Sequence, residues 1–200
     1  ALRERIMRNA IAILMVCQGV PMIFMGDETA HTKYGNNNTY AQDNELNWMD
    51  WSLLESNADL FRFAKRIIAF RHAHPVLRNR WHFSNRDYVG SGYADISWHG
   101  TKAWSADWSD SSRTIAFMLC GKHARGGAEQ DNYIYVAMNT HWEAHWFDLP
   151  GLPQGMQWHV AANTGAPSPD DIWEPGHEPL LPDQGGLLVG DRSMVVLVGK

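Results

Sequence analysis

The sequence predicts an α/β segment followed by an all-β, antiparallel sandwich, and three observations support this prediction. The first 26 residues read as an amphipathic helix, a glycine and a wholly apolar strand. A second amphipathic helix follows a long polar loop. Beyond about residue 80, the pattern changes to short β-type segments separated by turn residues, with no helix between them. We expect the boundary between the two parts near residues 78–86.

The N-terminal pattern indicates a helix and a buried strand. Apolar residues at helical spacing predict a helix over residues 1–18, with Leu2, Ile6, Ala10 and Ile13 on one stripe. Gly19 ends that helix, and residues 20–25 are an unbroken apolar run. A strand that is apolar on both faces is typical of a covered parallel sheet. Because a lone parallel strand leaves both of its edges unpaired, we expect this strand to need partners from elsewhere.

A polar loop and a second helix come next. Residues 29–57 carry no clear period and predict a long loop, a feature that is often functional. Residues 58–73 have the helical rhythm, and we expect Asn57 to be the N-cap. Pro75 stops the helix.

Six later segments predict strands, at residues 114–119, 133–138, 145–147, 158–161, 186–189 and 193–198. Turn-rich stretches separate them. Several short strands without helices between them predict an antiparallel sandwich.

Composition excludes two classes of partner. The net charge of −5 comes from mixed signs without a basic stripe, so we expect no nucleic-acid partner. The longest apolar run, residues 11–17, is far shorter than the roughly 20 residues that span a bilayer, so we expect no membrane partner. Cys17 and Cys120 lie in apolar segments far apart, which favours buried free thiols and a cytoplasmic protein.

Three stretches carry a family resemblance. Gly-Val-Pro-Met-Ile-Phe-Met-Gly-Asp-Glu at residues 19–28 is similar to the eighth barrel strand of the alpha-amylase superfamily. The following loop resembles that of isoamylases and bacterial glycogen debranching enzymes in its segments 31–32, 35–40, 43–44 and 46–48. Further on, the segments 96–100, 107–110 and 113–117 resemble the opening of that family's C-terminal β domain.

The resemblance implies the C-terminal fragment of a (β/α)₈ barrel over residues 1–82 and a C-terminal β-sandwich domain over residues 83–200. It implies hydrolysis of α-1,6 branch linkages in glycogen, amylopectin or limit dextrin by a retaining mechanism with two carboxyl groups. In the family those carboxylates follow barrel strands that precede the segment matched by residues 2–28. We therefore assign no catalytic residue, expect this chain to be inactive alone, and expect the remaining N-terminal barrel segment as its partner. Glycogen debranching and starch isoamylase activity both stay open.

Six residues are candidates for substrate binding. Asp27 and Glu28 are placed by the resemblance at the end of a barrel strand, on the face that carries active sites. Adjacent strand residues point to opposite faces, so they do not form a converging catalytic pair. A supporting role near substrate and simple hydrogen bonding at the barrel rim remain as alternatives. The loop adds amide groups and a ring that suit sugar contacts, namely Asn36, Asn37, Asn38 and Tyr40. Asparagine clusters are equally typical of turns.

Two other groups are weighed against plainer roles. The histidines His72, His74 and His82 lack the spacing of a metal site, so we expect no metal and no cofactor. The tryptophans Trp98, Trp104 and Trp108 could form a sugar platform, although we expect a structural role in the core or at a domain interface.

Competing functions come from different classes. One is a portion of a debranching enzyme, and the other is a self-standing carbohydrate-binding or interaction module. The apolar strand at residues 20–25 favours the first, because an independent β module has no use for it. A third alternative is an enzyme whose barrel is completed by a separate polypeptide.

Overall fold

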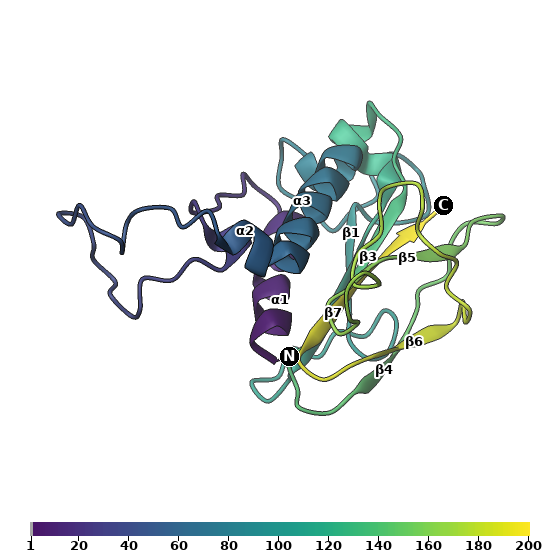
Figure 1. Cartoon of the computed structure of the whole chain (residues 1–200). Coiled ribbons are helices and arrows are strands. Elements are labelled where there is room, and N and C mark those ends of the chain that lie inside the picture. Colours follow the sequence, from purple (N-terminus) through teal and green to yellow (C-terminus); the bar gives the residue numbers. More distant parts are fainter. Residues whose placement is uncertain (1) are drawn as a thin grey trace.

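The chain folds into three layers, which a computed structural model describes for residues 2–200 (Figure 1). The central layer is a five-stranded sheet with strand order β1-β2-β3-β7-β5. Two helices cover one face of this sheet, and a two-stranded sheet of β4 and β6 covers the other. The chain between the helices forms a long loop that projects away from the layers, on the left in Figure 1.

The two predicted helices are confirmed. Helix α1 spans Leu2–Val16 and helix α3 spans Ala58–Ala73, while Ala1 lies outside the described residues. Two short 3₁₀ helices, η1 (Asp27–Thr29) and η2 (Pro75–Arg78), and the single-turn helix α2 (Leu53–Ser56) are additional. Asn57 is the N-cap residue of α3, as predicted, but its side chain makes no capping hydrogen bond, and its amide Nδ2 donates instead to the Thr29 carbonyl at 2.9 Å.

All six predicted strands are present. They are β2 (Thr114–Leu119), β3 (Tyr133–Asn139), β4 (His145–Asp148), β5 (Trp158–Asn163), β6 (Gly186–Val189) and β7 (Ser193–Gly199). Strand β1 (Ile96–His99) is a seventh, and a 3₁₀ segment η3 (Gly121–Gly127) separates β2 from β3. Every pairing between these strands is antiparallel, as predicted.

The central sheet is buried on both faces, and alternation along its strands divides the core in two. One set of side chains packs against α1 and α3, and it includes Phe117, Leu119, Ile134, Val136, Val196 and Val198. The alternate set packs against the two-stranded sheet, and it includes Met118, Tyr135, Ala137, Phe147, Val195 and Leu197. The predicted sandwich therefore has a small second sheet, because the helices take the other face.

Residues 20–25 are not a strand, which corrects the prediction. Their backbone forms no ladder with any described strand, and most of their apolar side chains face solvent, with Val20 97% and Met22 85% exposed, whereas Ile23 packs partly against the core. A strand needs hydrogen-bonding neighbours, and the described chain provides none for this segment. Residues 20–25 are all apolar, as a buried strand would be, but strand pairing depends on partners outside the segment. The described fold therefore does not by itself show a barrel fragment.

The two cysteines differ. Both are unbridged, but Cys17 is exposed whereas Cys120 is buried. The prediction of two buried thiols is therefore wrong for Cys17, which follows the last turn of α1 where no described element covers it. Among residues 2–200, no helix combines the length and the apolarity that crossing a bilayer demands.

Polar contacts join the helices to the rest of the chain. The buried carboxylate of Asp171 pairs with Arg8 of α1 at 2.7 Å and with Arg62 of α3. At the far end of α3, His74 Nδ1 lies 2.8 Å from the Asp131 carboxylate. The guanidinium of Arg71 donates to three carbonyls at the end of α1, those of Met15, Cys17 and Gly19. These contacts fix both helices on the sheet.

Candidate functional site

The loop that carries the predicted substrate-binding residues starts with a tight turn. Gly26 has a φ of 98°, and a Cβ at this position would lie 2.7 Å from the Cβ of His31. Only glycine combines that backbone with such close approach. The turn brings the chain after η1 back to Gly26, and the His31 N–H donates to the Gly26 carbonyl at 2.9 Å.

The carboxylates of Asp27 and Glu28 are engaged by this turn. Asp27 Oδ2 accepts the backbone N–H of Phe24 at 3.2 Å, and Glu28 Oε2 accepts that of Gly26 at 3.0 Å. Both groups therefore stabilise the local backbone. The sequence left two alternatives for these carboxylates, a supporting role near substrate and hydrogen bonding at the barrel rim. The contacts present in the described chain are hydrogen bonds within the loop.

The asparagines form turns at the tip of the loop. Asn36 Oδ1 accepts the N–H of Asn38 at 3.0 Å, and Asn38 Oδ1 accepts that of Tyr40 at 3.4 Å. These are Asx turns, which fold the tip locally. Asn37 is exposed, and the Tyr40 side chain is 98% exposed. The six predicted residues thus lie along one loop, but the structure does not gather them around one point.

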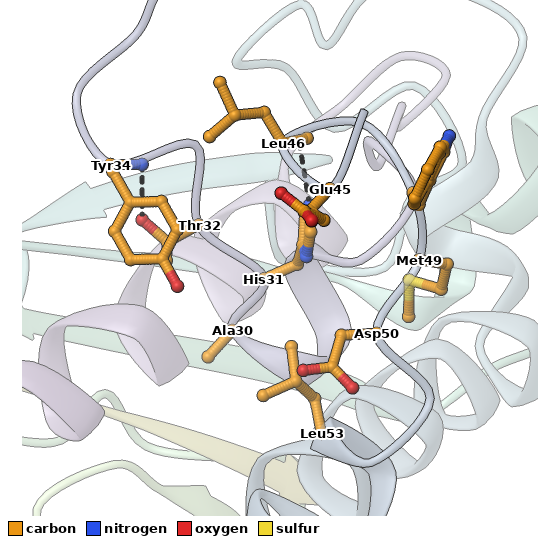
Figure 2. A pocket seen from close by; sticks show the side chains of 10 residues that line it. Ala30, His31, Thr32, Tyr34, Glu45, Leu46, Met49, Asp50 and Leu53 are labelled. Carbon is orange, nitrogen blue, oxygen red and sulfur yellow. Dashed lines mark hydrogen bonds between the residues drawn. The ribbon is translucent and has the colours of Figure 1, made fainter. Parts of the chain in front are cut away.

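A cavity of about 520 Å³ opens at the base of the same loop. Figure 2 shows side chains from residues 30–34 and 45–53, the two ends of the loop, meeting around it. Its chemistry-bearing residues are His31, Tyr34, Glu45, Trp48 and Asp50. Lys33 ties the two ends together, because its Nζ donates to the Leu46 carbonyl at 2.6 Å.

Sequence reasoning missed these lining residues as a set. Residues 31–32 and 46–48 carry the family resemblance, so a signal was present. The sequence did not show how the loop folds. In the structure, His31 Nε2 lies 3.3 Å from the Leu46 carbonyl, and this contact joins two segments that are 15 residues apart.

In this cavity, Asp50 is suited to binding rather than to general-acid catalysis. Ser52 donates to the Asp50 carboxylate from its hydroxyl at 2.6 Å and from its N–H at 3.0 Å. These hydrogen bonds lower the pKa of Asp50 below its ordinary value. A glycosidase general acid needs a raised pKa. Asp50 is therefore an acceptor, and the aromatic rings of Tyr34 and Trp48 add stacking surfaces.

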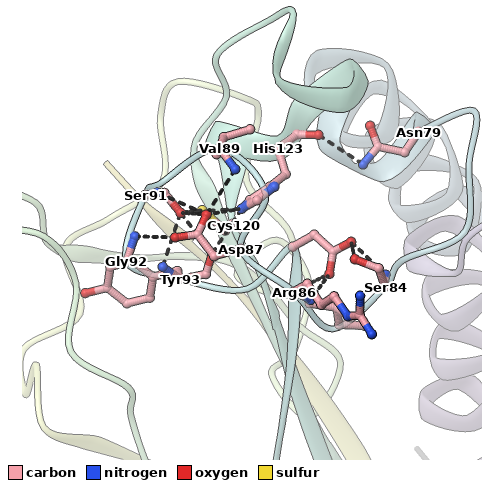
Figure 3. A network of polar contacts seen from close by, with 12 residues as sticks. Asn79, Ser84, Arg86, Asp87, Val89, Ser91, Gly92, Tyr93, Cys120 and His123 are labelled. Carbon is pink, nitrogen blue, oxygen red and sulfur yellow. Dashed lines mark hydrogen bonds and ion pairs between the residues drawn. The ribbon is translucent and has the colours of Figure 1, made fainter.

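A second polar cluster resembles a catalytic triad in composition (Figure 3). Ser91 Oγ lies 3.4 Å and Asp87 Oδ1 lies 3.3 Å from the same ring nitrogen of His123, Nε2. In a working triad the hydroxyl and the carboxylate contact opposite nitrogens. Here His123 Nδ1 is buried without a partner among the described residues. The cluster therefore has the wrong geometry for proton relay and serves to hold its loop.

The tryptophans and histidines singled out by the sequence take separate positions. Trp98, Trp104 and Trp108 lie outside the buried core, whereas their predicted role at a domain interface stays a prediction. Trp98 contacts Trp108 edge-on with ring centroids 5.5 Å apart. His72 and His82 are exposed, whereas His74 is buried against Asp131.

Comparison with known proteins finds relatives by sequence and by fold. Residues 97–184 match the family described as "Isoamylase 1-3, C-terminal". A "Glycogen operon protein GlgX homolog" of Mycobacterium tuberculosis is 40% identical over 180 residues, covering 85% of this chain and 25% of the relative. "Isoamylase 1, chloroplastic" of Arabidopsis thaliana is 40% identical over 176 residues, covering 87% of this chain and 20% of the relative.

Solved structures agree. A pullulanase from Paenibacillus barengoltzii, solved in complex with maltotetraose, has a TM-score of 0.66 and 26% identity. It is matched over 98% of this chain and 25% of its own length. A pullulanase from Bacillus acidopullulyticus has a TM-score of 0.69 over 98% of this chain and 20% of its own, and at 22% identity it supports the fold alone.

The chain therefore spans about a fifth to a quarter of the length of the relatives it matches. The match to the C-terminal domain, the relatives aligned over most of this chain and the shared fold point the same way. Residues 97–184 match the C-terminal domain of isoamylases, and most of the chain is similar to a part of isoamylase-type proteins.

Proposed function

We propose that this chain is a C-terminal portion of an enzyme that hydrolyses α-1,6 branch linkages in glycogen or a related α-glucan. The observation that carries the proposal is the match of nearly the whole chain to isoamylase-type proteins at about 40% identity. Amylopectin and limit dextrin are the other substrates of this class. Glycogen debranching and starch isoamylase activity are both compatible with the relatives.

The catalytic carboxylates come from the remaining N-terminal barrel segment in this proposal. Residues 1–82 are then the last part of a (β/α)₈ barrel, and residues 83–200 are its C-terminal β-sandwich domain. The exposed apolar side chains of residues 20–25 support the proposal, because they have the pattern of a barrel strand without neighbours. Retaining hydrolysis needs two converging carboxyl groups about 5–5.5 Å apart, and Asp27 and Glu28 bind their own turn instead.

The loop contributes to substrate binding in the intact enzyme. A strand over residues 20–25 would direct the loop toward the face of the barrel that carries active sites. Asp27, Glu28, Asn36, Asn37, Asn38 and Tyr40 are the proposed substrate-binding residues, and the 520 Å³ cavity adds His31 and Trp48. We also propose a cytoplasmic location, supported by two unbridged cysteines.

The test is branch cleavage by the full-length protein. Incubated with amylopectin, it should release linear chains and new reducing ends, while unbranched amylose should yield none. Cleavage of amylose with amylopectin branches left intact would contradict the proposal. A self-standing carbohydrate-binding module is the alternative, and it predicts no cleavage together with a stable full-length fold in which residues 20–25 stay exposed.

A further inference from the structure

A second cavity lies at the opposite end of α3 from the substrate loop. It has a volume of about 340 Å³, within the range of roughly 300–1,000 Å³ typical of small-molecule sites. Its walls come from the segment that joins η2 to β1 and from η3. The 16 residues of α3, about 24 Å at 1.5 Å per residue, separate it from residues 29–57. No lining residue is shared with the 520 Å³ cavity.

Two aromatic rings flank this cavity. The Trp81 side chain is 67% exposed, although one edge of its indole lies against Gly126. A Cβ on Gly126 would be 3.5 Å from Trp81 Cζ3, so the backbone itself supports the ring. Tyr88 is also exposed, and its ring packs edge-on against buried His123 at 4.3 Å.

The loop that carries Tyr88 is held by two carboxylates (Figure 3). Asp87 accepts backbone N–H groups from Val89, Ser91 and Gly92 at 3.2, 3.0 and 2.7 Å. These hydrogen bonds, with that from Ser91 first, lower the pKa of Asp87 to about 2. Asp95 accepts the N–H of Ser84 at 2.7 Å and that of Arg86 at 3.3 Å. An exposed ring on a loop fixed in this way can bind with little loss of conformational entropy.

Polar groups beside the rings remain available for a ligand. Asn79 Oδ1 accepts the Arg125 N–H at 2.7 Å, and Asn79 Nδ2 donates one hydrogen to the His123 carbonyl at 3.3 Å. Since an amide nitrogen carries two hydrogens, the second is free to donate. The His82 imidazole also lines the cavity and makes no hydrogen bond with residues 2–200.

We propose that this cavity binds a glucosyl unit of an α-glucan, as an accessory site where the proposed barrel portion meets the β domain. The apolar face of a pyranose would stack on Trp81 beside Tyr88, and its hydroxyls would contact Asn79 and His82. Rings that offer an apolar face, with a few polar groups at their rim, match a sugar, which has C–H groups on its faces and hydroxyls around them. The choice of an α-glucan rests on the proposed function.

Calorimetric titration of the 200-residue chain with maltoheptaose tests the site. We expect saturable binding that Trp81→Ala weakens roughly tenfold, the factor that about 1.4 kcal/mol produces. Trp142→Ala is the matched control, because Trp142 is 63% exposed and lies on the turn between β3 and β4. It should leave the affinity unchanged. Trp81→Phe keeps a ring and should retain more affinity than Trp81→Ala. His82→Ala, at an exposed position, should weaken binding without altering the melting temperature.

Three results would overturn the proposal. They are the absence of saturable binding to the chain, an equal loss of affinity in Trp142→Ala, and equal affinity for cellopentaose, whose β-1,4 linkages give a different shape. Branch cleavage by the full-length protein is measured separately. A chain that fails to bind maltoheptaose while the full-length protein still cleaves amylopectin would reject this accessory site and leave the proposed function standing.

Discussion

Side chains of one loop have two different environments. Asp27, Glu28, Asn36 and Asn38 are bound to nearby backbone groups, so their polar atoms hold the loop in shape. Tyr40 differs, because its side chain is 98% exposed and its hydroxyl and ring make no contact with residues 2–200. An exposed phenol on a loop with fixed turns is available for a ligand, since it can stack and hydrogen-bond together.

Replacement of Tyr40 by alanine in the full-length protein should therefore impair branch cleavage without unfolding it. Losing one stacking and hydrogen-bonding contact typically costs about 1–3 kcal/mol, or roughly ten- to a hundredfold in kcat/KM. The melting temperature should stay within a few degrees, because no packing is lost. Both quantities are measured on one preparation. Unchanged kinetics would remove Tyr40 from the site, and a joint fall of activity and stability would make it a structural residue.

His99 predicts a dependence of stability on pH. The residue is buried, its Nδ1 accepts the Trp104 N–H at 2.7 Å, and burial lowers its pKa from 6.5 to about 4. The unfolded chain binds a proton at this residue below about pH 6.5, whereas the folded chain stays neutral until about pH 4. Stability therefore falls as the pH drops through this window, by up to about 3 kcal/mol from this group.

The variant His99→Asn isolates that contribution. The asparagine oxygen can still accept the Trp104 N–H, but it does not titrate. Urea unfolding at pH 7 and pH 4.5 should show a smaller difference in the variant than in the wild type, while contributions from other groups cancel. An equal difference in both proteins would show that His99 is not the cause.

Secondary structure was predictable wherever a segment's own pattern decides it. Helix α3 and the strands from β2 to β7 follow from local apolar periodicity. Strand β1 was not predicted as a strand, because it has only four residues and ends in a histidine, whose burial beside Trp104 and Tyr135 depends on the tertiary fold. Residues 20–25 were predicted as a strand, but they have no partner in the described chain. Periodicity reports which faces are apolar, and partners decide whether a ladder forms.

Hydrogen exchange on residues 20–25 tests the proposed barrel strand. In the 200-residue chain these amides should exchange near the rate of an unstructured peptide, since within residues 2–200 they make no ladder and the one hydrogen bond among them, from the Phe24 N–H to the Asp27 carboxylate, is exposed. In the full-length protein, pairing with neighbouring strands should slow them on the order of a hundredfold or more. Amides of β3, protected in both proteins, serve as the control. Fast exchange of residues 20–25 in the full-length protein would argue against a barrel strand.

The carboxylate of Asp171 should anchor both helices to the β region. It is buried between Arg8 and Arg62, so Asp171→Asn leaves two guanidinium groups without their counter-charge. Breaking a buried pair is strongly destabilising, and we expect about 2 kcal/mol or more in urea unfolding. Asp191→Asn removes a more exposed partner from Arg5 and should cost less than about 1 kcal/mol. Equal effects of the two variants would contradict the anchoring role.

At the scale of the whole molecule, the sequence predicted the order of parts better than their contacts. The loop was predicted to be functional from its length and composition, but its cavity depends on a contact between His31 and Leu46, which are 15 residues apart. Likewise, Trp81 and Tyr88 flank one cavity because η3 brings Gly126 under the indole. No local period reports such contacts. The family resemblance depended on no single contact, because it is carried by residues over most of the chain.

The release of reducing ends from amylopectin by the purified 200-residue chain tests the central claim most directly. The two adjacent carboxylates at the start of the loop are turned toward their own backbone, and the pKa of Asp50 in the cavity is lowered rather than raised. The chain alone should therefore match the blank, and activity should appear only when the remaining N-terminal segment is joined to it or added. Turnover above the blank by the chain alone would contradict the claim that its catalytic carboxylates lie elsewhere.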